Sequence, residues 1–420
     1  MSRPKLGSGY HNLLVAASVS YLGDGAFLAA FPLLAASLTR DPRLVAGVVL
    51  AERLPWLLFA IVSGALVDRL DRRLVMGYVD GFRAVLTGVF AAAVLSGHAT
   101  IPLIYVFAFV LGVAETLFDN ASQAILPSVV TTDALERANS GLQASNVLST
   151  QFAGPPLGSL LFAAAVSLPF IVDAGSFAFS AGVILLMLRI PRRTSVEQRG
   201  RGSTLRSEIG EGLRWLWRNR LLRALAIMLG VWNMLETAIW SVFVLFALEV
   251  LRVEKSRYGI LLAAGALGGL VGAAVASRVS GRLGPGRSLL ACAGLSVIAY
   301  TVCGAVPNQY VVGGMIGLAG LTWNVITVSL RQTIIPDRLL GRVNSLYRFV
   351  GWGTMPLGAA AGGFLAKAFG LRATFFFSAG VLVLTAALAW PVLWGTAIED
   401  ARAAATREDG RTGSSEAGTS

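Results

Sequence analysis

The chain has 420 residues, of which 55% are hydrophobic and only 14% are charged, and its mean hydropathy is +0.68. Soluble globular proteins carry about 25% charged residues, so this chain has too little polar surface to fold as a water-soluble globule. The composition also excludes disordered chains and small disulfide-rich secreted proteins. It predicts an integral membrane protein, and its net charge of +12 requires an explanation.

Apolar segments long enough to cross about 30 Å of hydrocarbon recur along the chain. The twelve segments that we expect to span the membrane as helices are 11–38, 44–67, 74–96, 102–127, 139–166, 168–190, 221–248, 258–280, 287–306, 309–335, 343–368 and 371–396. The sequence therefore predicts an all-α integral membrane fold.

The basic residues are concentrated at the chain ends and in alternate loops, with the largest group at 189–223. Because cytoplasmic loops carry an excess of Lys and Arg, this pattern predicts that both termini are cytoplasmic. The same pattern accounts for the positive charge, so nucleic-acid binding is not expected.

A polar stretch divides the apolar segments into two sets of six. It starts as a flexible run, and then Leu205, Ile209 and Leu213 recur at helical spacing, which is typical of an amphipathic helix on the membrane surface. The expected divisions are a six-helix bundle at 1–190, a cytoplasmic linker at 191–220, a second six-helix bundle at 221–396 and a disordered tail at 397–420.

The two sets of segments also share sequence patterns. The stretch 64–73 after the second segment has a counterpart at 277–287 after the eighth, and Leu-x-Arg-x-Asn-Ser occurs at both 135–140 and 340–345. Paired repeats of this kind are a feature of secondary transporters. We expect two pseudo-symmetric six-helix bundles around a central cavity.

Carboxylates inside the expected spans are the strongest functional candidates, because an ionisable group in the membrane interior costs about 2.5–3.5 kcal/mol even on insertion scales. Both histidines fall at segment ends, and desolvation strengthens proton binding by a carboxylate. The candidates for proton coupling are Asp24, Glu115, Asp119 and Glu236.

Aromatic side chains share a helix face with Glu236, namely Trp232, Trp240 and Phe243. Rings around a carboxylate suit a bulky, amphipathic or cationic molecule, through stacking and cation–π attraction. Ordinary helix packing is the alternative interpretation. Weaker candidates for contact with a substrate in the cavity are Glu52, Trp56, Asn324 and Trp352.

Other charges within the spans have a structural interpretation. Asp80 and Arg83, three residues apart, are expected to neutralise each other. Glu52 and Arg53 point about 100° apart on a helix, so each is expected to need a different neighbour. We expect Asp173 to pair with a neighbouring helix or to cap a short loop.

Several short motifs fall on these loops and helices. Gly64-Ala-Leu-Val-Asp68-Arg69-Leu-Asp71-Arg72-Arg73 follows the second segment, and Gly154-Pro155-Pro156-Leu157-Gly158 lies in the fifth. The first resembles the loop 2–3 motif of the major facilitator superfamily, with Asp71 in place of a glycine, and the second is similar to the motif of drug–proton antiporters. The stretches 22–27, 117–127 and 173–177 resemble the branch that contains enterobactin exporters and macrolide-efflux proteins.

The resemblance covers the chain to about residue 396 and assigns roles to two motifs. In the first motif, which begins at Gly64, ion pairs between the carboxylate of Asp68 and the arginines Arg69, Arg72 and Arg73 would latch an inner gate and break as the two halves rock. The alternative is a basic loop that only fixes topology. In the second motif, Gly154, Pro155 and Gly158 would permit close helix approach and a bend.

The resemblance implies a secondary active transporter in a bacterial plasma membrane that works as a monomer. It would export a hydrophobic or amphipathic small molecule, such as an antibiotic, a siderophore or another secondary metabolite, by proton antiport with alternating access. A nutrient uptake symporter and a non-transporting sensor on the same fold are the alternatives. The sequence has no P-loop, no metal-ligand cluster and no nucleophile–base spacing, so we expect neither an enzyme nor a cofactor or metal.

Overall fold

The computed structural model describes residues 6–67, 70–187, 219–315 and 349–394, with short pieces between 214 and 217 and between 326 and 347. All regular structure in these residues is helical, and they contain no strand. The prediction of an all-α fold is therefore confirmed for this part of the chain. The expected tail at 397–420 and almost all of the linker at 191–220 lie outside the described residues.

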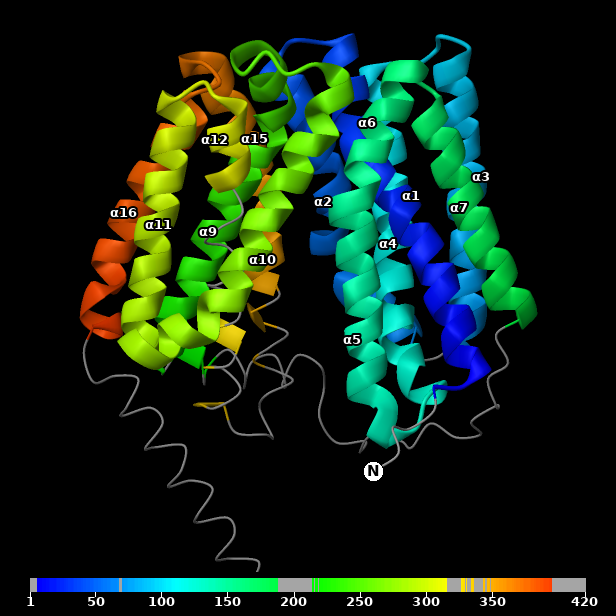
Figure 1. The fold of residues 1–420 in the computed structure, drawn as a ribbon, viewed down its shortest axis with the longest axis horizontal. Helices are drawn as coiled ribbons and strands as arrows, with labels where there is room; N and C mark the ends of the chain where they lie inside the picture. Colours follow the sequence, from blue (N-terminus) through cyan, green and yellow to red (C-terminus); the bar gives the residue numbers. More distant parts are fainter. Residues whose placement is uncertain are drawn as a thin grey trace, which may run out of the picture. The chain divides into compact units, whose positions relative to one another are not determined.

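The first half of the chain forms a series of long helices that run side by side (Figure 1). They are α1 (Ser8–Leu38), α2 (Pro42–Val67), α3 (Arg72–Leu95), α4 (Ile101–Ile125), α5 (Leu135–Asn146), α6 (Gly154–Ala164) and α7 (Leu168–Gly182). A π-helical segment, Val147–Ala153, joins α5 to α6, and another, Val183–Met187, extends α7. The fifth expected segment is thus one continuous helical path with a widened turn before Gly154.

The second half of the chain is helical in the same way. Its described helices are α9 (Arg220–Leu245), α10 (Tyr258–Leu283), α11 (Pro285–Ala305), α12 (Gln309–Met315), α15 (Met355–Phe369) and α16 (Ala373–Leu393). A π-helical segment, Phe246–Val250, extends α9, and a short 3₁₀ turn, Lys255–Arg257, precedes α10. Most of the tenth expected segment lies outside the described residues.

Length and composition qualify seven helices of the described residues as candidate membrane spans. They are Ser8–Leu38, Arg72–Leu95, Ile101–Ser122, Leu168–Leu186, Arg220–Val250, Pro285–Ala305 and Ala373–Leu393. Each coincides with one of the twelve expected segments. The full count of twelve stays a prediction.

Contacts divide the described residues into two compact units. Unit 1 contains those within Met1–Val196, Trp240–Ala266 and Ala359–Leu371, and unit 2 contains those within Glu197–Ile239, Leu267–Gly358 and Arg372–Ser420. Unit 1 thus joins the first helices to one end each of α9, α10 and α15. In unit 2, α11 packs along α16.

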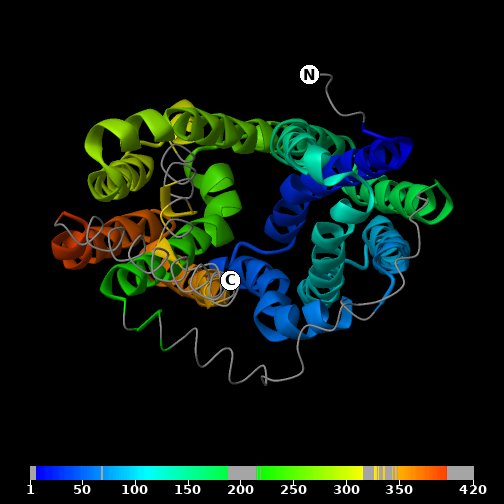
Figure 2. The ribbon, with the colours of Figure 1, turned by 90° about the horizontal axis from the view of Figure 1, so that it is seen from below.

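Within unit 1, α1 packs against α6 and α7, α3 packs against α4 and α7, and α2 packs against α4 (Figures 1 and 2). We call the two ends of this unit the Asp41 end, where α1 leads into α2, and the Arg73 end, where α3 begins. The side chain of Asp71 starts α3 by accepting hydrogen bonds from the backbone N–H groups of Arg73 and Leu74, at 3.0 and 3.4 Å. Asp71, which stands where the related motif has glycine, is therefore a helix cap here.

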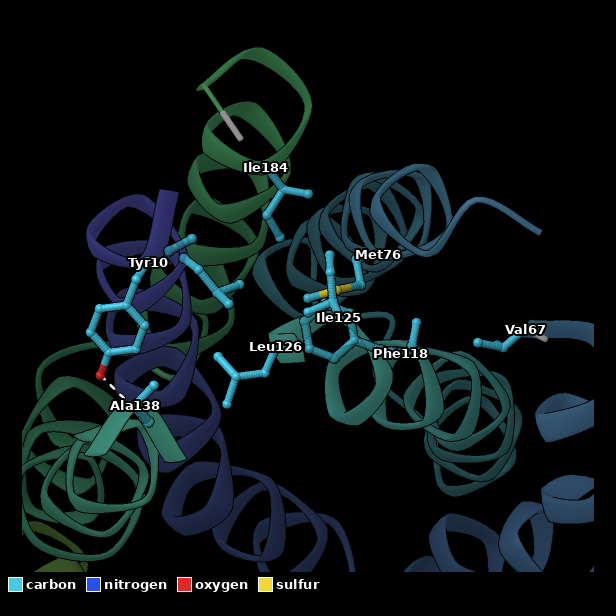
Figure 3. Close-up of a cluster of buried hydrophobic side chains, with 11 residues drawn as sticks. Tyr10, Val67, Met76, Phe118, Ile125, Leu126, Ala138 and Ile184 are labelled. Carbon is cyan, nitrogen blue, oxygen red and sulfur yellow. Dashed lines mark hydrogen bonds between the residues drawn. The ribbon is translucent and has the colours of Figure 1, made fainter. Parts of the chain in front are cut away.

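Two apolar layers fill the interior of α1, α3, α4 and α7. Toward the Asp41 end, five phenylalanine rings contact one another: Phe27, Phe31, Phe90, Phe107 and Phe170. Toward the Arg73 end lies a second cluster, shown in Figure 3, that includes Tyr10, Met76, Phe118, Ile125 and Ile184. The polar residues described next lie between these two layers.

Candidate functional site

Four charged side chains from three helices meet in the middle of unit 1. Asp24 comes from α1, Asp80 and Arg83 from α3, and Asp173 from α7. We call these four residues the charge cluster. Arg83 Nη1 lies 3.4 Å from Asp80 Oδ1, and Arg83 Nη2 lies 3.6 Å from Asp24 Oδ1. The predicted Asp80–Arg83 pair is confirmed, whereas the link from Arg83 to Asp24 was not expected from the sequence.

The members of the charge cluster differ strongly in exposure. The side chain of Asp24 is 31% exposed, whereas those of Arg83 and Asp80 are 6% and 0% exposed. Asp173 is also buried, at 1%. Asp24 is therefore the accessible member of the cluster, and the two other carboxylates are enclosed.

Each enclosed carboxylate has its own environment. Asp80 Oδ2 accepts a hydrogen bond of 2.6 Å from the hydroxyl of Ser180. Asp173 Oδ1 has only the Ser176 hydroxyl, at 3.5 Å, and Asp173 Oδ2 has no hydrogen-bond partner among the described residues. Asp80 is therefore well compensated by a cation and a hydroxyl, and Asp173 is poorly compensated.

A glycine on α1, Gly23, allows Asp173 and Ser176 of α7 to lie against the α1 backbone next to Asp24. A Cβ atom at Gly23 would stand 2.1 Å from Ser176 Oγ and 2.7 Å from Asp173 Oδ1. Any side chain at this position would push α1 away from α7. The glycine next to Asp24 therefore permits close contact between α1 and the Asp173–Ser176 turn of α7.

Two phenylalanine rings hold the guanidinium of Arg83. Its Cζ atom lies 4.2 Å from the ring centroid of Phe177 on α7 and 5.5 Å from that of Phe118 on α4. These cation–π contacts favour a charged guanidinium in a site with little solvent. Arg83 Nε has no hydrogen-bond partner among the described residues, so the group retains donor capacity.

The two acids of α4 lie on the border of the charge cluster. Glu115 interacts electrostatically with Asp24 and Arg83, and Asp119 interacts with Arg53 of α2. Both side chains are partly buried. The structure thus brings Asp24 and Glu115, two of the four proton-coupling candidates, into one electrostatic environment.

Glu52 and Arg53 of α2 form an ion pair with each other, with Arg53 Nη2 3.2 Å from Glu52 Oε1. The expectation that each would need a different neighbour is wrong. Adjacent positions on a helix do point about 100° apart, but the long arginine side chain bends back to reach the carboxylate. Glu52 also interacts electrostatically with Glu115, which places it near the α4 acids.

The fourth acid, Glu236, lies on α9 within unit 2, where it interacts electrostatically with Tyr300 of α11. Of its predicted aromatic neighbours on α9, Trp232 is 4% exposed and Phe243 is 0% exposed. The Phe243 ring lies 4.8 Å from that of Trp240 and 6.3 Å from that of Tyr258. In the conformation described here, Phe243 is thus a packing residue.

The other predicted contacts for a substrate are Trp56, Trp352 and Asn324. Trp56 on α2 and Trp352, which comes shortly before α15, are partly buried, and Asn324 lies outside the described residues. Contact of these residues with a substrate stays a prediction.

The basic motif after α2 is described only in part, because Asp68 and Arg69 lie outside the described residues. Gly64 lies in the last turn of α2. Arg73 donates hydrogen bonds to the carbonyl oxygens of Ile184, at 3.0 Å, and of Leu185. A cation at the C-terminal carbonyls of a helix is stabilising. Arg73 therefore stabilises the contact between α3 and the π-helical segment that extends α7. Arg72 is partly buried beside it.

The glycine–proline motif of α6 contacts two helices at once. A Cβ atom at Gly154 would stand 2.5 Å from Gly25 Cα, and one at Gly158 would stand 2.1 Å from the Ala26 carbonyl oxygen, so both glycines face α1. From α10, a Cβ atom at Gly259 would stand 1.8 Å from the Pro155 carbonyl oxygen. The motif therefore permits backbone contact, the role that small residues have in membrane helix packing.

Exposed ion pairs join helices at the Asp41 end. Asp41 Oδ2 lies 2.8 Å from Arg43 Nη2 and 3.4 Å from Lys367 Nζ of α15, and Arg40 Nη1 lies 3.3 Å from Glu249 Oε1. The hydrogen bond from Arg43 is the main reason that the pKa of Asp41 lies well below its usual value, and the same pair raises the pKa of Arg43. These contacts connect the start of α2 to the second half of the chain.

The all-helical fold, the candidate spans and the enclosed charges define a membrane protein of the transporter class. A profile of the transmembrane secretion effector family, MFS_3, matches residues 7–407. The chain belongs to this family of the major facilitator superfamily, in the branch of drug exporters that its sequence motifs resemble.

Two relatives agree with this assignment. The chain is 28% identical over 381 residues to the multidrug efflux pump Tap of Mycolicibacterium fortuitum, covering 86% of this chain and 90% of the pump. It is 23% identical over 347 residues to macrolide efflux protein A of Streptococcus pyogenes, covering 81% and 84%.

Two solved structures share the fold. A bacterial homologue of the iron transporter ferroportin, in an inward-facing state, has a TM-score of 0.72 at 17% identity, covering 92% of this chain and 98% of that one. The nucleoside transporter NupG has a TM-score of 0.71 at 11% identity, covering 92% and 99%. At such identities, these two structures establish the fold alone.

Proposed function

We propose that this protein exports a hydrophobic or amphipathic small molecule, such as an antibiotic, a siderophore or another secondary metabolite, by proton antiport with alternating access. Two relatives that span most of the chain are named as a multidrug efflux pump and a macrolide efflux protein, which supports export. The proposal includes twelve spans in two pseudo-symmetric bundles, a plasma-membrane location with both termini cytoplasmic, and function as a monomer.

The observation that carries proton coupling is the environment of Asp24. This carboxylate lies in the first candidate span, is 31% exposed and is 3.6 Å from the enclosed Arg83. It can either remain ionised against Arg83 or take up a proton and release the guanidinium. A carboxylate inside a span with these two options is suited to couple proton movement to transport.

The substrate is proposed to contact Asp24, and Glu236, Trp232 and Trp240 of α9 are the further candidates for contact with it. Protonation of Asp24 would then compete with a cationic or hydrogen-bonding group of the guest. Glu115 and Asp119 would tune this competition, because Glu115 acts on Asp24 directly.

The test begins with a susceptibility panel of macrolides, tetracyclines and lipophilic cations, in cells with and without the protein. Everted membrane vesicles then report whether adding a transported compound releases protons from an acid interior. We expect resistance and proton release in the wild type. In Asp24→Asn we expect both to fall to the values measured without the protein.

The matched control is Asp133→Asn, which changes an exposed aspartate outside the charge cluster and should retain wild-type transport. Full proton-driven export in Asp24→Asn would refute the role of Asp24. Accumulation of the compound by intact cells would instead indicate an uptake symporter, and absence of any substrate-dependent proton movement would indicate a sensor.

A further inference from the structure

We propose that Asp173 holds a proton in the enclosed part of the charge cluster, and that Arg83 exchanges between Asp24 and Asp173 so that this proton passes to the accessible carboxylate. The proposal deepens the proposed function, on which it rests for the use of the proton. It assigns to Asp173 a role that its sequence position does not indicate.

The charge balance of the cluster requires a proton. Three aspartates face one arginine, and Arg83 remains charged at all physiological pH values. Arg83 is within ion-pair distance of Asp24 and Asp80. An ionised Asp173 would add an uncompensated charge at 1% exposure, and burying such a charge is costly enough that the group neutralises instead.

Asp173 is the carboxylate best suited to hold that proton. Asp80 has both Arg83 and the 2.6 Å hydrogen bond from Ser180, which stabilise its ionised form. Asp24 has Arg83 and is 31% exposed. Asp173 has only a long contact to Ser176 at one oxygen, and its other oxygen has no hydrogen-bond partner among the described residues.

The charged and titratable groups near Asp173 come from the helices that pack against α7. From α1 come Asp24 and Tyr21, and from α3 come Asp80 and Arg83, while α6 carries no titratable residue. Glu115 of α4 faces Arg83 as well and adds negative charge. Arg83 is therefore the only cation that the described residues place near Asp173, and its charge acts on Asp173 together with that of Asp24.

The geometry provides for an exchange of partners. Among the residues that the structure describes, Arg83 Nε and Asp173 Oδ2 are a donor and an acceptor without a hydrogen-bond partner, and both belong to the same buried cluster. In the first state, Asp24 is ionised against Arg83 and Asp173 carries the proton. In the second, Asp24 carries the proton and Arg83 turns to an ionised Asp173. One proton moves, the cluster keeps the same net charge, and the proton reaches the residue from which it can leave.

The first experiment needs no knowledge of the transported compound. Infrared spectroscopy of the purified full-length protein in lipid detects the C=O stretching band of a protonated carboxyl group. We expect this band in the wild type at a pH far above about 3.9, the ordinary aspartate pKa. We expect it to be lost in Asp173→Asn and kept in the control Asp133→Asn. A band that persists unchanged in Asp173→Asn would overturn the proposal.

Two further variants keep the proposal testable if Asp173→Asn does not fold, and they examine the exchange of Arg83 between its partners. Ser176→Ala leaves the carboxyl of Asp173 in place and removes its hydroxyl contact, so the band should remain with a shifted frequency even if Asp173→Asn fails to fold. Asp24→Asn removes the competitor for Arg83, so the band should be weaker than in the wild type at the same alkaline pH. An unchanged band in Asp24→Asn would refute the exchange.

Transport assays separate this inference from the proposed function. In vesicles, Asp173→Asn should abolish proton release driven by a transported macrolide or ethidium, while counterflow of the same compound, which needs no net proton movement, continues. Equal loss of both activities would indicate a merely structural residue. Wild-type vesicles without any proton release would refute the proposed function and leave the spectroscopic assignment of Asp173 standing.

Discussion

The charge cluster and the Asp41 end are both built from aspartates paired with basic side chains, and they differ in exposure. Arg83 and Asp80 are 6% and 0% exposed, whereas Arg43 and Lys367 are 47% and 51% exposed. Enclosed charges leave a costly imbalance when one of them is removed, and exposed charges are compensated by water. We therefore expect the same ion-pair chemistry to influence proton binding in the charge cluster and only helix contact at the Asp41 end.

The largest effect is expected from replacing the central cation. Arg83→Gln leaves Asp24, Asp80 and Asp173 without their guanidinium, and breaking a buried pair by removing one partner costs about 3–5 kcal/mol. We expect a clearly lower thermal unfolding midpoint in detergent and a smaller folded yield. The matched variant Arg43→Gln, at the Asp41 end, should cost about 1 kcal/mol or less. Equal destabilisation of the two variants would contradict the distinction between the regions.

The sequence predicted the seven helices that qualify as candidate spans and one ion pair of the charge cluster. Apolar length gives the spans, and the three-residue spacing predicted the Asp80–Arg83 pair, because such side chains lie on one helix face. The Asp24–Arg83 pair depends on α1 and α3 both packing against α7, and helix neighbours are not encoded in the periodicity of any one helix. For the same reason, the sequence could not decide whether Asp173 pairs with a neighbouring helix or caps a short loop.

Helix geometry gave one wrong prediction, for Glu52 and Arg53, and it did not predict the contacts of the glycines on α1 and α6. The direction of adjacent helix positions excluded a Glu52–Arg53 pair that the flexible arginine nevertheless forms at 3.2 Å. The glycines that bring α1, α6 and α7 together, Gly23 and Gly158, were visible in the sequence. Their neighbours could not be predicted, because they depend on tertiary contact: a hydroxyl group lies against Gly23 and a carbonyl oxygen lies against Gly158.

A smaller effect is expected from Lys367→Gln at the Asp41 end. The variant removes the 3.4 Å ion pair between α15 and the loop before α2, and exposed pairs contribute about 0–1 kcal/mol. The difference in unfolding midpoint between variant and wild type should shrink as salt is added, because ions screen exposed charges. Arg83→Gln should keep its deficit at high salt, since its partners are enclosed. A salt-independent deficit in Lys367→Gln would show that this contact is not mainly electrostatic.

The smallest effect concerns the pH dependence of the Asp41 end. The pKa of Asp41 in the folded protein is held below its usual value, first by the hydrogen bond from Arg43. A carboxyl group with a depressed pKa contributes stability above its unfolded pKa of about 3.9, and this contribution is lost as the pH falls through the folded value.

Asp41→Asn keeps an oxygen that can accept the hydrogen bond from the Arg43 backbone N–H at the start of α2. The variant should therefore be slightly less stable than the wild type at neutral pH, and the difference should disappear under acid conditions. Unfolding midpoints measured across that range, with Asp133→Asn as the control, check this sign, and a difference that grows in acid would contradict it.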